Sequence, residues 1–203
     1  MKIICVGQNY LEHIKELSNV KSKEPLVFLK PDTALISKGR SFFIPNFSKE
    51  IHYELEIVIK IKKPGRYIER KFSSQYYDEI TVGIDFTARD LQKNLREKGH
   101  PWEKSKGFDG STLVGNFLNK HDLPPISNLN FHLLKNGHTV QNENTKNMIW
   151  PIDELIEHIS KFFTLKIGDL IFTGTPSGVG AVIFEDNLKG FLEGKQLFEI
   201  NVS

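Results

Sequence analysis

Two glutamates separated by one residue are the strongest candidates for chemistry in this chain. Glu54 and Glu56 lie in an apolar stretch, residues 53–61, whose β-branched side chains predict a strand. Because side chains alternate along a strand, both carboxylates are expected on one face. Asp85 ends a second apolar stretch, and no basic residue stands beside these carboxylates in the sequence. The three suit a hard divalent cation, Mg²⁺ or Mn²⁺, although an exposed charged strand face would equally explain the glutamate pair.

His13 and Glu16 form a second candidate pair. They stand three residues apart in a short predicted helix, residues 10–17, and therefore lie on the same side of it. A carboxylate that contacts one ring nitrogen would leave the other nitrogen as a general base. The spacing alone favours an ordinary solvent-exposed pair over a catalytic one.

Two further stretches could bind an anion. Lys106 stands between Trp102 and Phe108 and could bind a carboxylate, although a surface lysine is the simpler explanation. Residues 173–180 are rich in glycine but match neither a phosphate-binding P-loop nor a dinucleotide fingerprint. Their backbone N–H groups and the Thr175 hydroxyl suit an anionic group, and a tight turn is the alternative.

The elements that must position these residues are short strands and a few helices. Strands are predicted at residues 2–6, 25–29, 41–44, 53–61, 80–86, 131–134, 138–141, 169–172 and 196–202. Asn136-Gly137 predicts a hairpin turn. Helices are predicted after Asn9 and after Thr87 as N-caps, and at 151–163 with Phe162 on the apolar face. Strands outnumber helices and do not alternate with them, so we expect a β-rich α+β fold.

The composition is that of an ordinary globular chain. It has 203 residues, of which 39% are hydrophobic and 26% charged, with a formal net charge of +2. Basic residues are scattered, so we expect no nucleic-acid or membrane partner. The single Cys5 excludes an internal disulfide. With no signal peptide or membrane-spanning stretch in the sequence, we expect a cytoplasmic protein.

Taken in order, these segments resemble the fumarylacetoacetate hydrolase superfamily, most closely its short acylpyruvate hydrolase-like branch. The matching segments are residues 7–10 with His13 and Glu16, residues 28–31, 52–56 and 85–92, Lys106 after Trp102, and residues 145–149 and 168–176. The resemblance implies one catalytic domain over residues 1–203, the mixed β-roll of the superfamily's C-terminal domain, and a homodimer.

The resemblance also implies roles for the candidate residues. It implies Glu54, Glu56 and Asp85 as ligands for Mg²⁺ or Mn²⁺, His13 and Glu16 as a water-activating dyad, Lys106 as a substrate-polarising cation, and Arg89, Gln92, Gly174 and Thr175 as substrate-binding residues. Gln8 stands where members of the family frequently carry arginine, which bears on how the far end of a substrate is held.

The implied reaction is hydrolysis of a C–C bond in acylpyruvate-type 2,4-dioxo acids to pyruvate and a carboxylic acid. The same site could instead decarboxylate or tautomerise oxaloacetate, or isomerise 2-hydroxyhepta-2,4-diene-1,7-dioate. A non-catalytic 2-oxo acid binder is a further alternative, which a water-activating dyad argues against. Residues 13–24, with their polar stretch Ser18 to Lys23, are expected to cover the site as a lid.

Overall fold

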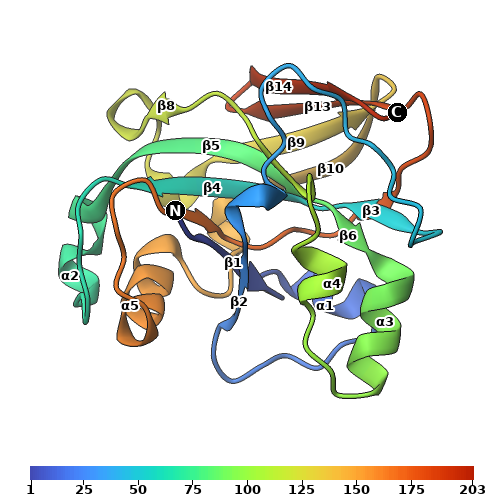
Figure 1. The fold of residues 1–203 in the computed structure, drawn as a ribbon. Coiled ribbons are helices and arrows are strands. Elements are labelled where there is room, and N and C mark those ends of the chain that lie inside the picture. The colour runs from blue at the N-terminus through green and yellow to red at the C-terminus, as the bar shows by residue number, and fades with distance from the viewer.

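The computed structural model describes residues 1–203, and its largest sheet has seven strands (Figure 1). Six strands follow the order β2-β1-β11-β4-β5-β7, and β8 pairs with β5. Only β1 and β11 pair in parallel; the other pairs of this sheet are antiparallel. The strands are β1 (Ile3–Gly7), β2 (Leu26–Lys30), β4 (Leu55–Ile61), β5 (Tyr77–Asp85), β7 (Thr112–Val114), β8 (Leu118–Asn119) and β11 (Leu170–Phe172). The predicted β-rich α+β fold class is confirmed.

Strands β4 and β5 are the long central pair of this sheet and carry two of the three candidate carboxylates. Their antiparallel register sets Glu56 opposite Gly83. The backbone N–H of Asp85 donates to the carbonyl oxygen of Glu54 at 2.9 Å, so the last residue of β5 lies beside the start of β4. The strand predicted at 53–61 is interrupted at Glu54, which joins β3 (Ile51–Tyr53) to β4.

Two smaller sheets complete the β-structure. A four-stranded sheet, in the order β10-β9-β13-β14, packs over β4 and β5 and shares one apolar core with them. Its strands are β9 (Asn130–Lys135), β10 (His138–Asn144), β13 (Asn187–Leu192) and β14 (Lys195–Asn201). The third sheet has the order β12-β3-β6, with β6 (Thr87–Ala88) and β12 (Gly180–Ala181). The predicted hairpin turn is confirmed, because Asn136 and Gly137, with φ of 51° and 81°, join β9 to β10.

The five helices lie below β4 and β5 in Figure 1, in two groups. Helices α1, α3 and α4 gather on one side, and α2 packs against α5 on the other. Their bounds are α1 (Leu11–Glu16), α2 (Arg70–Ser73), α3 (Arg89–Glu97), α4 (Glu103–Lys106) and α5 (Ile152–Phe162). Helices α3 and α4 are in contact and follow β5 in the chain, so their residues lie near the carboxyl end of β5.

Three details of the helices and one strand differ from the prediction. The residue before α1 is Tyr10, because Asn9 is buried and its side chain bonds elsewhere. Thr87 pairs in β6, so α3 begins after Ala88. Phe162 is 62% exposed, although Ile156 and Ile159 of the same helix are buried. The strand predicted at 41–44 does not form, and only an isolated β-bridge joins Phe42 to Val202.

Candidate active site

A cavity opens between the carboxyl end of β5 and the group formed by α1, α3 and α4. It is open to solvent on one side and is lined by 17 residues. Eight of the ten residues predicted for the site line it: His13, Glu54, Glu56, Asp85, Arg89, Gln92, Lys106 and Thr175. The other two, Glu16 and Gly174, hydrogen-bond to lining residues. The structure therefore brings together residues that lie as far apart in sequence as 13 and 175.

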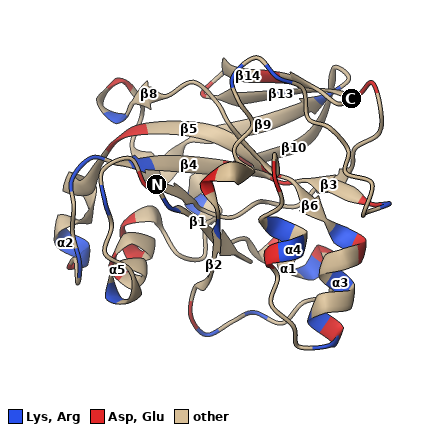
Figure 2. Cartoon of the chain, viewed as in Figure 1, with Lys and Arg blue, Asp and Glu red and all other residues tan.

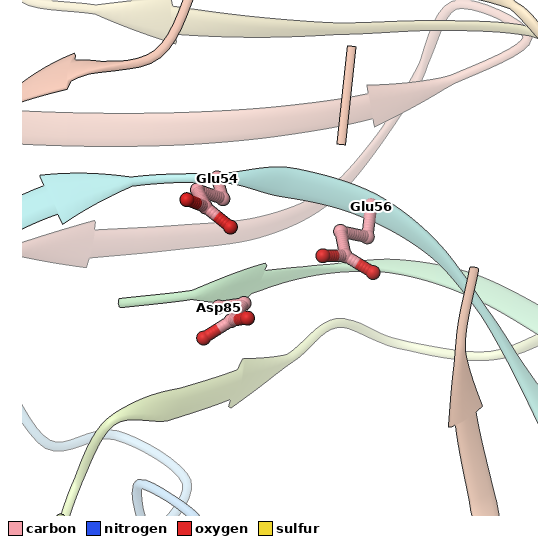
Figure 3. A group of neighbouring side chains, drawn as sticks. All are labelled: Glu54, Glu56 and Asp85. Atoms are coloured by element: carbon pink, nitrogen blue, oxygen red, sulfur yellow. The ribbon is translucent and has the colours of Figure 1, made fainter. Parts of the chain in front are cut away.

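The three carboxylates converge at the floor of the cavity (Figure 3). Oxygen atoms of Glu54, Glu56 and Asp85 lie within 4.8 Å of one another. None of the three residues is more than 4% exposed. An exposed charged strand face therefore does not describe them, and the group has the separation and chemistry of a divalent-cation site.

Three cations surround this carboxylate group, contrary to the pattern along the sequence. Lys30 Nζ lies 2.6 Å from Asp85 Oδ1. Lys106 Nζ donates to Glu54 Oε2 at 2.7 Å and to Asp85 Oδ2 at 2.8 Å, and Arg89 pairs with the other oxygen of Glu54. The premise that the carboxylates lack basic neighbours is wrong for two of the three, because the partners come from β2, α3 and α4. Glu56 alone pairs with no cation.

Burial and neighbouring charges shift the pKa values of Glu54, Glu56 and Lys106 in different directions. Burial by itself would raise the pKa of the Glu54 carboxyl, but Lys106 and Arg89 outweigh it and hold that pKa well below its usual value. Burial also opposes the charge of Lys106, but Asp85 and Glu54 raise its pKa above the usual value. For Glu56, burial followed by repulsion from Asp85 and Glu54 raises the pKa well above its usual value. Glu56 is therefore the carboxylate whose negative charge lacks compensation.

The backbone of Gly174 supplies a hydrogen bond to the Glu56 carboxylate. Its backbone N–H donates to Glu56 Oε2 at 2.7 Å. Gly174 has a φ of +99°, and an added Cβ would lie 2.7 Å from the Cβ of Asn9, so only glycine fits without strain. The predicted contact between Gly174 and a substrate stays a prediction, since this N–H already has a partner. Thr175 Oγ1 accepts from Gln141 Nε2 at 2.9 Å.

The His13–Glu16 pair lies at the α1 side of the cavity. His13 Nδ1 lies 3.0 Å from Glu16 Oε2, and Gly178 N donates to Glu16 Oε1 at 2.9 Å. Because a carboxylate only accepts, Nδ1 carries the hydrogen and Nε2 is left as a base. His13 is only 5% exposed, so the solvent-exposed pair favoured by spacing alone is not what forms.

Sequence reasoning missed two residues that position the site. Lys30 is fully buried and also donates to the carbonyl oxygen of Ser111 at 2.9 Å. Asn9 donates through Nδ2 to the carbonyl oxygens of Thr173 and Trp150, and accepts from the Trp150 N–H. A lysine at the end of an apolar strand before a proline was the available signal for Lys30, since buried lysines need a partner. Nothing in the local sequence indicates that the Asn9 side chain hydrogen-bonds to two segments distant in sequence.

Helix α3 supplies one wall of the cavity. Arg89 NH1 donates to Gln92 Oε1 at 2.6 Å, and Arg89 also reaches Glu54. Figure 2 shows that α3 and α4 carry several basic residues near this end of the sheet. Across the cavity, Gln8 has a left-handed backbone with φ of 60°, which is rare outside glycine and is often found at functional sites.

Comparison with known proteins identifies the family. The sequence model described as "Fumarylacetoacetate (FAA) hydrolase C-terminal" matches residues 2–203. The chain belongs to this family. The fumarylacetoacetate hydrolase fold expected from the resemblance is confirmed, since a crystal structure of a fumarylacetoacetate hydrolase family protein from Yersinia pestis superposes with a TM-score of 0.95 at 38% identity, covering 100% of this chain and 93% of that one.

Relatives of this family protein carry different activities in their names. The chain is 36% identical over 192 residues to "Oxaloacetate tautomerase FAHD1, mitochondrial" of Bos taurus, covering 95% of this chain and 87% of that protein. Fumarylpyruvate hydrolase from Pseudomonas aeruginosa, solved in complex with Mn²⁺ and pyruvate, superposes with a TM-score of 0.93 at 33% identity, covering 100% of this chain and 89% of that one. Family members are thus enzymes of more than one reaction class.

The donor set of this fumarylacetoacetate hydrolase family protein fits a hard divalent cation. It offers only carboxylate oxygens, which Mg²⁺ and Mn²⁺ prefer. Glu56 is the decisive observation, because it is buried, lies within 4.8 Å of the other two carboxylates and forms no ion pair. A bound cation would compensate that charge. In this protein no helix is both long and apolar enough to cross a membrane.

Proposed function

We propose that this protein is a metal-dependent hydrolase that cleaves a C–C bond in acylpyruvate-type 2,4-dioxo acids. The observation that carries the proposal is the presence of the His13–Glu16 pair and the buried carboxylate group in one cavity. A general base is needed only where a proton is removed, here from water. A protein that merely binds a 2-oxo acid needs no such pair.

The chain's own residues account for the proton and charge movements. His13 Nε2 accepts a proton from water while Glu16 stabilises the charged ring, and the hydroxide adds to the C4 carbonyl carbon. The C3–C4 bond then breaks with its electron pair on C3, and the proton held on His13 goes to C3, which yields pyruvate and a carboxylic acid. Lys106 and Arg89 supply positive charge beside the reacting end. A divalent cation held by Glu54, Glu56 and Asp85 would supply Lewis acidity toward the 2-oxo acid.

Charge balance supports an anionic substrate. Glu54 and Asp85 are paired with Lys30, Lys106 and Arg89, so the addition of a divalent cation leaves the floor of the cavity with excess positive charge. A 2-oxo acid carboxylate would compensate that excess. Substrate contacts of Gln92 and Thr175 are part of the proposal, because both side chains line the cavity.

A second candidate is oxaloacetate tautomerisation or decarboxylation, which is favoured by the name of the bovine relative. Decarboxylation consumes no water, so it does not require a water-activating base. Decarboxylation therefore makes a different demand on His13 from hydrolysis, whereas tautomerisation removes a proton from C3 and needs a base as hydrolysis does. All three reactions would share the carboxylate group.

The deciding experiment compares wild type and His13→Ala on acylpyruvates, fumarylpyruvate and oxaloacetate, with Mg²⁺ or Mn²⁺ present. We expect the wild type to hydrolyse 2,4-dioxo acids, and His13→Ala to lose that activity by at least about a hundredfold. Partial retention of oxaloacetate decarboxylation in the variant would support the division of roles. An absence of 2,4-dioxo acid cleavage by the wild type across the panel would refute the hydrolase proposal.

We also propose that the protein is a cytoplasmic homodimer. Support for a dimer comes from large apolar side chains that are exposed beside the C-terminal segment, namely Phe43, Ile183 and Phe184. Their sequence neighbours form backbone hydrogen bonds with that segment. Phe42 bonds to Asn201 and Ser203, and Glu185 bonds to Val202. Light scattering would test the dimer, with the mass of one chain as the contrary result.

A further inference from the structure

We propose that Gln141 is a positioning residue of this active site, which directs the hydroxyl hydrogen of Thr175 into the cavity so that Thr175 donates to an anionic ligand. The inference rests on the proposed function and deepens it, because it gives the proposed contact of Thr175 a direction and a cause. Gln141 is only 1% exposed and does not line the cavity, whereas Thr175 does. Gln141 therefore acts on a ligand through Thr175.

The side-chain amide of Gln141 is oriented by partners that each have only one role. The backbone N–H of Leu55 can only donate, and it donates to Gln141 Oε1 at 2.9 Å. The carbonyl oxygen of Pro176 can only accept, and it accepts from Gln141 Nε2 at 3.0 Å. The amide oxygen is therefore fixed toward Leu55, and the NH2 group is fixed toward the segment that carries Thr175.

This orientation decides the role of the Thr175 hydroxyl. Gln141 Nε2 donates to Thr175 Oγ1 at 2.9 Å, so this oxygen is an acceptor. The single hydroxyl hydrogen then points to another acceptor. The fold offers the Pro176 carbonyl oxygen at 3.5 Å, which is at the limit of hydrogen-bond distance and already bonded to Gln141. A carboxylate in the cavity would be a stronger acceptor, because hydrogen bonds to charged groups are shorter and stronger.

A bulge in β10 places Gln141 for this contact. The register of β10 against β9 shifts between Thr139 and Gln141, so Val140 is an extra residue in the strand. Such bulges re-aim neighbouring side chains and are common beside active sites. The segment after Thr175 lies directly against the bulge, because a Cβ added to Gly178 would clash with the carbonyl oxygen of Val140.

Gln141 also connects the Thr175 segment to the carboxylate group. Leu55, whose N–H the Gln141 oxygen accepts, stands between Glu54 and Glu56 in the chain. Thr175 and both glutamates line one cavity. A buried amide whose groups are all paired holds its neighbours in a fixed arrangement. The Thr175 donor is therefore fixed relative to the residues that would hold a cation and its anionic ligand.

The test is a double-mutant cycle on ligand affinity. Oxalate is the probe, because it is anionic, resembles the 2-oxo acid end of a substrate and is not a 2,4-dioxo acid that the proposed reaction would consume. Calorimetric titration with Mg²⁺ present would measure its affinity for wild type, Thr175→Val, Gln141→Met and the double variant. The same pair of measurements in Thr175→Ser, which retains the hydroxyl, completes the comparison.

Asn144→Leu is the matched control. Asn144 is a second buried polar side chain of β10 and does not line the cavity. Its amide donates to Asn130 Oδ1 at 2.9 Å and accepts from the Lys146 N–H at 2.9 Å, so it makes no contact with the Thr175 segment. It reports what the loss of buried hydrogen bonds in this strand does to the affinity for oxalate.

We expect Thr175→Val to weaken oxalate binding by about 10- to 100-fold, the range for a hydrogen bond to a charged group. Gln141→Met should weaken it by about five- to tenfold in wild type and in Thr175→Ser. In Thr175→Val the same change should alter the affinity by less than about twofold, because no hydroxyl is left to direct. Asn144→Leu should bind oxalate as wild type does.

A second substitution keeps the test decisive if Gln141→Met does not fold, since that change leaves the Leu55 N–H without a partner. Gln141→Asn retains an amide, but its side chain is one methylene shorter and does not reach both Leu55 and Thr175. We expect it to give the same dependence on the Thr175 hydroxyl. Circular dichroism would establish that each variant is folded before its affinity is compared.

The outcomes separate this inference from the proposed hydrolase function. No binding of oxalate by wild type, an unchanged affinity in Thr175→Val, or an equal effect of the Gln141 change with and without the Thr175 hydroxyl would overturn the role of Gln141, whatever the protein catalyses. A loss in Asn144→Leu equal to that in Gln141→Met would do the same. The expected coupling in a protein that cleaves no 2,4-dioxo acid would instead retain this role and refute the hydrolase.

Discussion

The floor and the rim of the cavity are built in opposite ways. At the floor, Glu54, Glu56 and Asp85 are almost fully buried on or beside the long strands β4 and β5. At the rim, Glu16 ends the six-residue helix α1, and its side chain is 30% exposed. The floor is held by ion pairs in the core, whereas the rim is held by a few hydrogen bonds near solvent. A buried end and an end near solvent thus share one cavity.

This contrast has an electrostatic origin. Charges buried among strands must be compensated where they stand, since removing either partner leaves a charge in a medium of low polarity. Charges at the rim can be compensated by water and tolerate replacement. Substitution of a paired charge at the floor should therefore lower stability, whereas substitution at the rim should lower the rate alone.

The largest effect is expected at the uncompensated floor residue. Glu56→Gln, or treatment of the wild type with excess chelator, should lower turnover of 2,4-dioxo acids by about a thousandfold or more, because several kcal/mol of charge stabilisation at the 2-oxo acid end are lost. Steady-state kinetics before and after addition of Mg²⁺ or Mn²⁺ would measure this. Full activity in chelator would exclude a metal requirement.

The second effect concerns stability within the floor itself. Asp85→Asn leaves the fully buried Lys30 without its counter-charge and should lower the free energy of unfolding by about 3 kcal/mol. Glu56→Gln removes a carboxylate with no cationic partner and should leave the metal-free protein equally stable or more stable. Urea unfolding in chelator would compare them, and an equal loss in both variants would contradict the assigned pairing.

A smaller effect is expected at the rim. Glu16→Gln should lower kcat for hydrolysis by about a hundredfold, because His13 loses the carboxylate that stabilises its charged form. The free energy of unfolding should change by less than about 0.5 kcal/mol, since the side chain is partly in solvent. A large loss of stability together with a small loss of rate would reverse the contrast between rim and floor.

The smallest effect is expected at Asp186, a buried carboxylate outside the cavity whose charge is compensated by its neighbours. Burial by itself would raise the pKa of Asp186, but hydrogen bonds from Lys135, Ile183 and Asn136 outweigh it and lower that pKa. The stabilisation is therefore present above the unfolded-state pKa and is lost as the pH falls through the folded-state pKa. Asp186→Asn should cost about 1 kcal/mol at neutral pH and progressively less in acid, as measured by urea unfolding at several pH values.

The local sequence was sufficient to predict most single elements near the site. The alternation around Glu54 and Glu56, the Asn136-Gly137 turn and the amphipathic pattern of α5 depend on neighbours in sequence, so they were predicted from it. The N-caps failed, because Asn9 and Thr87 make their bonds with segments distant in sequence. The exposure of Phe162 was not predicted for a related reason, since the periodicity of a helix does not indicate which of its turns other segments cover.

The sequence by itself determined which residue types could form the site, through the two glutamates, the aspartate, the dyad spacing and the family motifs. Only the tertiary structure decided their charge state and their neighbours. Lys30 meets Asp85, and Arg96 meets Asn19, across 55 and 77 residues of chain. Such pairings follow from sheet register and helix placement, which no local pattern contains. For the same reason, only the folded chain distinguishes Glu56, which forms no ion pair, from Glu54 two residues before it.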